Sequence, residues 1–378
     1  MHINDFMSIL DDLGAEFFTG VPDSLLSSFT DFIMNKHGIS RYHVVAANEG
    51  AAVGLAAGHY LATGKPAVVY MQNSGIGNAI NPICSLLHKK VYGVPVIFVV
   101  GWRGEPGTKD EPQHVFQGEV TLSLLECMDI PYIVVSKDTV DLSAYVEKFK
   151  EHLQNGESIA FVIRKSALVN DEKVEYTSDA ELCREQVLTH IIDNSNGNDV
   201  FVCTTGKLSR EIFEIREQKG MGHGQDFLTV GSMGHSLMIA YGIALAKPEK
   251  RIFCLDGDGA ILMHLGSLAV LGAANPKNLV HVVINNGAHE TVGGIPTVAI
   301  NINFSEVASK LGYCHIFRVE TELDLQQTMD KLTETELKGA VFVEIICNLQ
   351  SRADLGRPTT TPEQNKNDLI KFLLGGAE

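Results

Sequence analysis

The sequence predicts an α/β fold built from two doubly wound parallel-sheet domains. Short apolar runs, typical of buried strands, alternate with segments of helical periodicity along most of the chain. The 378 residues suffice for two ordinary α/β domains. A hydrophobic content of 45% with 20% charged residues indicates a soluble globular protein that can fill both cores.

A change of composition marks the boundary between the domains. Polar and charged residues dominate Lys165–Glu181, which indicates a linker. We expect a first domain over residues 1–165, a linker over 166–183, a second domain over 184–350, and a tail with a final short helix over 351–378.

The first domain should alternate strands and helices from its start. Asn4 is expected to cap a helix with one apolar face. The expected strands are 16–20, 43–47, 65–72, 94–101, 130–135 and 159–163. The first of them ends in the turn Gly20-Val21-Pro22-Asp23-Ser24, and a helix over 25–34 follows.

Glu49 follows the second of these strands and begins a helix of small residues. One interpretation is a first-turn glutamate favoured by the helix dipole. The other is a buried carboxylate whose pKa is raised by loss of solvent and which hydrogen-bonds a ligand nitrogen.

Two loops follow later strands of the first domain. Asn73–Ala79 is Gly-rich and opens a helix, but its spacing does not match the GxGxxG dinucleotide motif. Residues 102–118, WRGEPGTKDEPQHVFQG, are expected to form an irregular polar loop containing Arg103, Lys109 and His114. Long loops of this kind are often functional, although a solvated surface loop is the alternative.

The second domain contains the most informative stretch, Arg251–Pro296. An apolar strand ends in Asp256-Gly257-Asp258-Gly259, a helical segment follows, and a second strand over 279–284 ends in Asn285-Asn286-Gly287. A right-handed crossover places both strand ends at one edge of a parallel sheet, so Asp258 and Asn286 can meet. Their oxygens suit Mg²⁺, and a helix N-terminus beside them suits phosphate. A tight turn with a capping Asn pair is the alternative.

The remaining second-domain elements are a helix from Arg184 and strands that begin at Val200, Phe227, Phe317 and Ala340. Met233 lies between Gly231 and Gly234 just after a strand, and on spacing alone it is a core methionine. A short final helix is expected over 368–374.

Gly257-Asp258-Gly259 followed by Asn285-Asn286 resembles the diphosphate motif of thiamin diphosphate-dependent 2-oxo acid decarboxylases. AANEGAAVGLAAGHYLATGK around Glu49 resembles the segment of that family that contacts the aminopyrimidine. The resemblance covers nearly the whole chain. Within the family, the chain is most similar to the phosphonopyruvate decarboxylases, with the sulfopyruvate decarboxylases next, and RGEPGTKDEPQH closely resembles the phosphonopyruvate decarboxylase form.

The resemblance implies roles for individual residues. Asp258, Asn286 and the main chain of Ala288 would hold Mg²⁺. Glu49 would contact N1′ of the aminopyrimidine and act in catalysis with His114. The other implied cofactor contacts are Asn73, Thr205, Gly206, Gly231, Ser232, Met233, Gly257, Gly259, Ala260, His289, Glu290 and Thr291, with Met233 as the wedge beneath the cofactor. The implied substrate contacts are Asp23, Ser24, Arg103, Lys109 and His114.

Bulk properties limit the partners. A net charge of −16 argues against nucleic acid and anionic membranes. The seven cysteines lack CxxC spacing, and no signal peptide is expected, so we expect free thiols in the cytoplasm. The resemblance implies thiamin diphosphate and Mg²⁺ as cofactors, a small-molecule substrate, and a homodimer or dimer of dimers with shared active sites.

Three alternatives to a phosphonopyruvate decarboxylase stay open at this point. A sulfonate resembles a phosphonate as a tetrahedral anion, so sulfopyruvate is the nearest alternative substrate. A carboligase is a second possibility, although the larger relatives insert a middle domain where this chain has only a linker. A noncatalytic binder is the third, and the intact Glu49, Asp258 and Asn286 argue against it.

Overall fold

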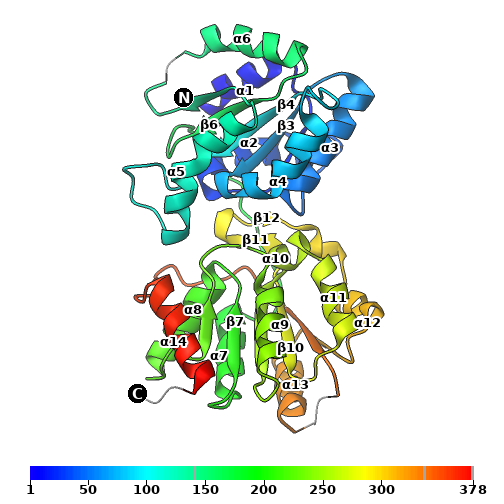
Figure 1. Ribbon diagram of the computed structural model, residues 1–378, viewed down its shortest axis with the longest axis vertical. Helices are drawn as coiled ribbons and strands as arrows, with labels where there is room; N and C mark the ends of the chain where they lie inside the picture. Colours follow the sequence, from blue (N-terminus) through cyan, green and yellow to red (C-terminus); the bar gives the residue numbers. More distant parts are fainter. Residues whose placement is uncertain (140, 335–337, 376–378) are drawn as a thin grey trace. The chain divides into compact units, whose positions relative to one another are not determined.

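The computed structural model describes residues 1–139, 141–334 and 338–375. The chain divides into two compact units, Met1–Glu175 and Tyr176–Glu378. Both units are α/β, with strands and helices alternating along the chain (Figure 1). Within the described residues, no helix is long and apolar enough to cross a bilayer.

The first unit is built on a parallel sheet with strand order β2-β1-β3-β4-β6-β5 in its described part. The strands are β1 Phe18–Gly20, β2 His43–Val45, β3 Ala67–Gln72, β4 Val96–Gly101, β5 Tyr132–Val135 and β6 Ile159–Ile163. The helices are α1 Ile3–Asp12, α2 Ser27–His37, α3 Glu49–Thr63, α4 Ile76–Pro82, α5 Pro112–Cys127 and α6 Ser143–Gln154.

Alternate residues of these strands fill two separate cores. Val68 and Tyr70 face the core that includes side chains of α1, α2 and α6. Val69 and Met71 face the core that includes side chains of α3, α4 and α5. Because both faces of the sheet are covered, the strands are mostly apolar, as expected for a doubly wound parallel sheet.

The second unit has a parallel sheet with strand order β13-β14-β10-β9-β7-β8 in its described part. The strands are β7 Val200–Cys203, β8 Asp226–Leu228, β9 Ile252–Gly257, β10 Leu279–Asn285, β13 His315–Val319 and β14 Val341–Ile346, and β11 Ala288–His289 pairs with β12 Ile295–Pro296 outside the sheet. The helices are α7 Arg184–Asp193, α8 Lys207–Gln218, α9 Ser236–Ala246, α10 Asp258–Met263, α11 Gly266–Ala274, α12 Phe304–Leu311, α13 Glu322–Glu334 and α14 Pro362–Leu374. Helices α7, α8 and α13 contribute to the main core on one face.

Two parallel sheets, each sandwiched between helices, confirm the predicted fold class. The register places Gly257 of β9 opposite Ile284 of β10. The residues that follow these two strands therefore emerge side by side at the carboxyl edge of the second sheet.

Several predicted elements have wrong boundaries. Residues 112–118 are not part of an irregular loop, because α5 begins at Pro112, whose fixed φ and missing N–H suit the first helical position. The last helix begins at Pro362 instead of residue 368, with a capping box formed by Thr361 and Gln364. His2, and not Asn4, caps the first helix.

Candidate active site

Asp258 is the first residue of α10 and lies at the end of β9. Its carboxylate is buried and accepts a 2.5 Å hydrogen bond from Thr297 Oγ1. No ion pair to Asp258 is present in the described part of the chain, and burial raises the pKa of Asp258 to about 6. A buried carboxylate without a cationic neighbour favours binding of a metal ion, which would supply the missing charge.

Asn286 follows β10 and is the second predicted ligand. Its Oδ1 accepts a 3.2 Å hydrogen bond from Ala288 N, and its Nδ2 donates a 3.2 Å hydrogen bond to Glu290 Oε2. These two partners orient the amide. The oxygen therefore retains a lone pair for a metal, while the nitrogen faces the carboxylate.

A cavity of about 570 Å³, open to solvent, lies at this edge of the sheet. It is lined by eleven of the predicted cofactor contacts: Thr205, Met233, Gly257, Asp258, Gly259, Ala260, Asn286, Ala288, His289, Glu290 and Thr291. Gly259 keeps part of this space open, because a Cβ there would lie 3.1 Å from Met233 Cε and 3.3 Å from His289 Cε1. Burial lowers the pKa of His289 to about 4, so its imidazole is neutral near pH 7.

Three of the contacts predicted in the second unit do not line the cavity. Gly206 lies directly before α8, with φ of 100°, and a Cβ there would approach Thr291 at 3.5 Å. Gly231 and Ser232 lie on the segment before Met233, and Ser232 has a left-handed φ of 53°. Their roles as contacts stay predictions.

Sequence reasoning missed two cations that line the cavity, Arg184 and Lys207. Arg184 pairs with Glu211 at 2.6 and 2.7 Å and also binds Glu290. Lys207 Nζ donates to Glu290 Oε1 at 2.8 Å and to Ser351 Oγ at 2.6 Å. Lys207 follows a Thr-Thr-Gly turn at a helix N-terminus, which was an available signal for an anion site.

These residues fit a magnesium diphosphate. Asp258 and Asn286 offer the hard oxygen ligands that Mg²⁺ prefers. Lys207, Arg184 and the free N–H groups at the start of α8 offer positive charge for phosphate oxygens. Although burial opposes ionisation of Glu290, Arg184 and Lys207 outweigh it and lower the pKa of that carboxyl.

Glu49 lies at the carboxyl edge of the first sheet, as the first residue of α3. Its side chain is buried, and Asn78 Nδ2 donates a 2.8 Å hydrogen bond to its Oε2. Burial raises the pKa of Glu49. Gly75 leaves the room for this carboxylate, because a Cβ at Gly75 would lie 2.6 Å from Glu49 Cδ. The buried-carboxylate interpretation therefore describes Glu49 better than an exposed first-turn glutamate.

Asn73, a predicted cofactor contact, is engaged within the first unit. Its Nδ2 donates to the Arg103 carbonyl at 2.9 Å and to Thr121 Oγ1 at 2.8 Å, and its Oδ1 accepts from Arg103 N at 3.2 Å. One amide proton of Asn73 thus holds the main chain after β4, and the other bonds the side chain of Thr121 on α5. Any contact of Asn73 with a cofactor stays a prediction.

A polar cluster surrounds Arg103, and we call Asp23, Ser24, Arg103, Asp110 and His114 the Arg103 network. Arg103 binds Asp110 through two hydrogen bonds of 2.8 and 2.6 Å, donates to Ser24 Oγ at 3.1 Å, and lies 4.0 Å from Asp23. Asp110 Oδ1 also lies 2.9 Å from His114 Nδ1. The structure therefore brings together four of the five predicted substrate contacts.

The ionisation of the two acids differs. Burial raises the pKa of Asp23, whose Oδ1 accepts a 2.7 Å hydrogen bond from Gln72. Burial also opposes ionisation of Asp110, but Arg103 and His114 outweigh it and hold the pKa of that carboxyl well below its usual range. Lys109, the fifth predicted substrate contact, is exposed on the loop outside the network. Asp110 was not predicted, although its position four residues before His114 was a usable signal.

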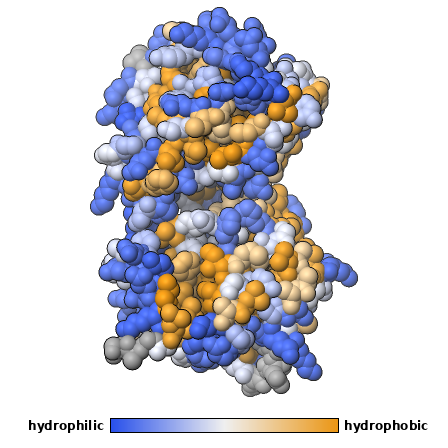
Figure 2. Space-filling model, viewed as in Figure 1, coloured by the Kyte–Doolittle hydropathy of each residue, from blue (hydrophilic) through white to orange (hydrophobic). Residues whose placement is uncertain are grey.

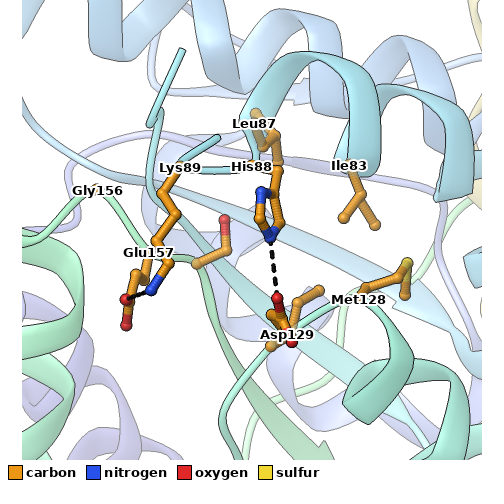
Figure 3. A pocket seen from close by; sticks show the side chains of 10 residues that line it. Ile83, Leu87, His88, Lys89, Met128, Asp129, Gly156 and Glu157 are labelled. Atoms are coloured by element: carbon orange, nitrogen blue, oxygen red, sulfur yellow. Dashed lines mark hydrogen bonds and ion pairs between the residues drawn. The ribbon is translucent and has the colours of Figure 1, made fainter. Parts of the chain in front are cut away.

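A second cavity, of about 300 Å³, lies at the amino edge of the first sheet (Figure 3). It borders the π-helical turn Ile83–Leu87 and contains an ion pair of 3.2 Å between His88 and Asp129. No predicted site residue lines it, and Glu49 and the Arg103 network lie at the opposite edge of the sheet. We therefore do not assign the second cavity to the active site.

Comparison with known proteins identifies the family. Residues 4–125 match the N-terminal thiamine pyrophosphate binding domain of thiamine pyrophosphate enzymes, and residues 204–345 match the C-terminal binding domain. The chain belongs to the thiamin diphosphate-dependent enzymes.

Three relatives of this thiamin diphosphate enzyme refine the comparison. It is 32% identical to phosphonopyruvate decarboxylase of Streptomyces viridochromogenes over 95% of this chain and 92% of the relative. It is 31% identical to that of Streptomyces hygroscopicus over 96% of this chain and 91% of the relative. The sulfopyruvate decarboxylase beta subunit of Methanothermobacter thermautotrophicus is 33% identical over 48% of this chain and 90% of the subunit. These relatives support a thiamin diphosphate-dependent 2-oxo acid decarboxylase.

Proposed function

We propose that this chain decarboxylates 3-phosphonopyruvate to phosphonoacetaldehyde and carbon dioxide with thiamin diphosphate and Mg²⁺, as a step in phosphonate biosynthesis that leads toward 2-aminoethylphosphonate. The observation that carries the proposal is the similarity to phosphonopyruvate decarboxylases over nearly the whole length of both chains. Sulfopyruvate is the second candidate substrate, because sulfopyruvate decarboxylase subunits match parts of the chain with similar identity.

We assign the diphosphate to the cavity of the second unit. Asp258, Asn286 and the Ala288 carbonyl would hold Mg²⁺, and Lys207 and Arg184 would balance the phosphate charge. When bound, thiamin diphosphate accepts the electrons released as carbon dioxide leaves. In this proposal the first unit is the aminopyrimidine-binding domain and the second is the diphosphate-binding domain.

Glu49 is proposed to hold a proton on the aminopyrimidine ring. Its raised pKa and its hydrogen bond from Asn78 suit a carboxyl that shares a proton with a ring nitrogen. Gly75 fixes its place, because any larger residue would displace the carboxylate. His114, held by Asp110 through Nδ1, is proposed to act beside the substrate through its other ring nitrogen.

The Arg103 network is proposed to bind the phosphonate. A dianionic group needs fixed cations in a chain of net charge −16. Arg103 already faces Asp110 and Asp23, so an anion must compete with acids for the guanidinium.

The test is release of carbon dioxide from phosphonopyruvate, sulfopyruvate and pyruvate in parallel, with and without thiamin diphosphate and Mg²⁺. We expect the highest kcat/KM with phosphonopyruvate and no turnover without the cofactors. Preference for sulfopyruvate would support the second candidate, and no carbon dioxide from any 2-oxo acid would refute the decarboxylase assignment.

Substrate selection by Arg103 is tested in the same assay. Arg103→Ala should raise KM for phosphonopyruvate more than for pyruvate, because only phosphonopyruvate carries the second anionic group. Arg164→Ala is the matched control, since Arg164 pairs with Glu105 of the same loop but lies outside the Arg103 network. Equal effects of Arg103→Ala on both substrates would place phosphonate binding elsewhere.

We further propose that the chain works in the cytoplasm as a homodimer or dimer of dimers. Large apolar side chains are exposed on several helices, among them Leu61 on α3, Ile80 on α4, Leu245 on α9 and Val270 on α11. Figure 2 shows apolar residues at the surface of both units. Apolar surface of this kind supports burial against another chain. All seven cysteines are free thiols, which supports a reducing compartment.

A further inference from the structure

Glu290 lies between the proposed metal ligand Asn286 and two cations. Its Oε2 accepts the 3.2 Å hydrogen bond from Asn286 Nδ2 and also binds Arg184. Its Oε1 accepts a 2.8 Å hydrogen bond from Lys207 Nζ. The Glu290 side chain is only 8% exposed, so these contacts replace nearly all of its hydration.

The cations are themselves fixed by other partners. Arg184 is held by Glu211 through two hydrogen bonds of 2.6 and 2.7 Å, and both of these side chains are buried. Lys207 also donates to Ser351 Oγ at 2.6 Å. The Glu290 carboxylate is therefore held from both sides, by one cation on each oxygen.

An amide can present either its oxygen or its NH₂ group to a metal, and only the oxygen is a ligand. The carboxylate of Glu290 accepts hydrogen bonds and cannot donate one, so it selects the orientation in which Asn286 Nδ2 faces Glu290. The Ala288 N–H selects the same orientation from the other side by donating to Asn286 Oδ1.

We propose that Glu290 is a positioning residue that presents the Asn286 oxygen to the metal, and that Arg184 and Lys207 hold Glu290 for this purpose. The inference rests on the proposed function, because it assumes the metal site at Asp258 and Asn286. It differs from the direct cofactor contact that the resemblance implies for Glu290, since its effect passes through Asn286. Residues that orient a metal ligand typically contribute about 10- to 100-fold to metal affinity.

Two substitutions separate positioning from simple charge. Glu290→Ala removes the hydrogen-bond acceptor and the charge together. Glu290→Gln removes the charge, but its amide oxygen can take the place of Oε2 and accept from Asn286 and Arg184. The Gln NH₂ group would then face Lys207, which keeps Ser351 as a partner. Positioning predicts that Gln preserves what Ala loses.

The metal affinity is measured with Mn²⁺ in place of Mg²⁺, in the presence of thiamin diphosphate. The electron paramagnetic resonance signal of free Mn²⁺ gives the amount that is not bound. We expect Glu290→Ala to raise the Kd for Mn²⁺ at least about 10-fold and Glu290→Gln to raise it less than about 3-fold, within the range such partners contribute. Glu214→Ala is the matched control. Glu214 lies on the same helix as Glu211 and forms an ion pair with Arg352, but it does not line the cavity.

The outcomes are distinct. Equal losses in both Glu290 variants would show a charge effect and overturn the positioning role, as would a Kd in Glu290→Ala within about 2-fold of the unchanged chain. If Glu290→Ala fails to fold, Glu290→Gln decides alone: a loss of about 10-fold or more overturns the inference, and near-normal affinity supports it. Absence of Mn²⁺ binding by the unchanged chain would instead remove the proposed metal site, and the inference with it.

Discussion

Replacement of Asp258 by asparagine should make the metal-free protein more stable while abolishing metal binding. The carboxylate is buried, it accepts a side-chain hydrogen bond from Thr297, and its pKa of about 6 lies above the ordinary value of 3.8. Folding therefore disfavours the ionised form of Asp258. This cost is absent well below pH 3.8 and is complete once the pH has risen above the folded pKa.

The size of the effect follows from the two pKa values. With 3.8 unfolded and about 6 folded, ionisation of Asp258 costs about 1.6 kcal/mol of unfolding free energy at pH 5 and about 3 kcal/mol at pH 8. The asparagine side chain of the variant does not titrate. The stability of Asp258→Asn relative to the unchanged chain should therefore increase by about 1.4 kcal/mol between pH 5 and pH 8.

Urea unfolding of the metal-free chain at both pH values, followed by circular dichroism, measures this difference. Trp102, the only tryptophan, lies in the first unit, so its fluorescence reports the unfolding of that unit separately. Thiamin diphosphate with Mg²⁺ should stabilise the unchanged chain at pH 8 but not the variant. Asp193→Asn, which removes a half-exposed carboxylate of the same unit as Asp258, is the control for the loss of one negative charge. A relative stability of Asp258→Asn that is flat or falls with pH would refute the reasoning.

Three further predictions concern the first unit and the assembly. Glu49→Gln should keep the fold and cofactor binding but lower kcat about 10²–10⁴-fold, and near-normal turnover with cofactor bound would reject its catalytic role. Gly75→Ala should force Glu49 out of place, which costs about 1–3 kcal/mol of unfolding free energy and lowers kcat. Gly77→Ala is the control, because a Cβ at Gly77 meets open space and should change neither quantity. Wild-type activity in Gly75→Ala would contradict the packing argument. If Glu49 of one chain and Asp258 of its neighbour serve one cofactor, mixing inactive Glu49→Gln and Asp258→Ala chains should restore about a quarter of the sites. Verified subunit exchange without recovered decarboxylation would reject shared sites.

The sequence alone predicted the fold class and the edges where polar residues gather. Buried parallel strands need apolar residues on both faces, so they are visible as short apolar runs. Asp258 and Asn286 follow two such runs joined by a helical segment, and the right-handed crossover rule then places them together. The position of Glu49 at a strand–helix junction was similarly visible, because local sequence determines where a strand ends and a helix begins.

Only the tertiary structure decided which distant groups complete each site. Arg184 pairs with Glu290 across 106 positions of sequence, and Thr297 reaches Asp258 across 39. The requirement for Gly75 appears only when Glu49 is packed against it. Strand periodicity gives no information on such pairs, because they depend on the order of strands in the sheet and on the paths of the loops. The charge of Arg103 is likewise matched by Asp110 of its own loop and by Asp23 of the turn after β1, which composition could not show.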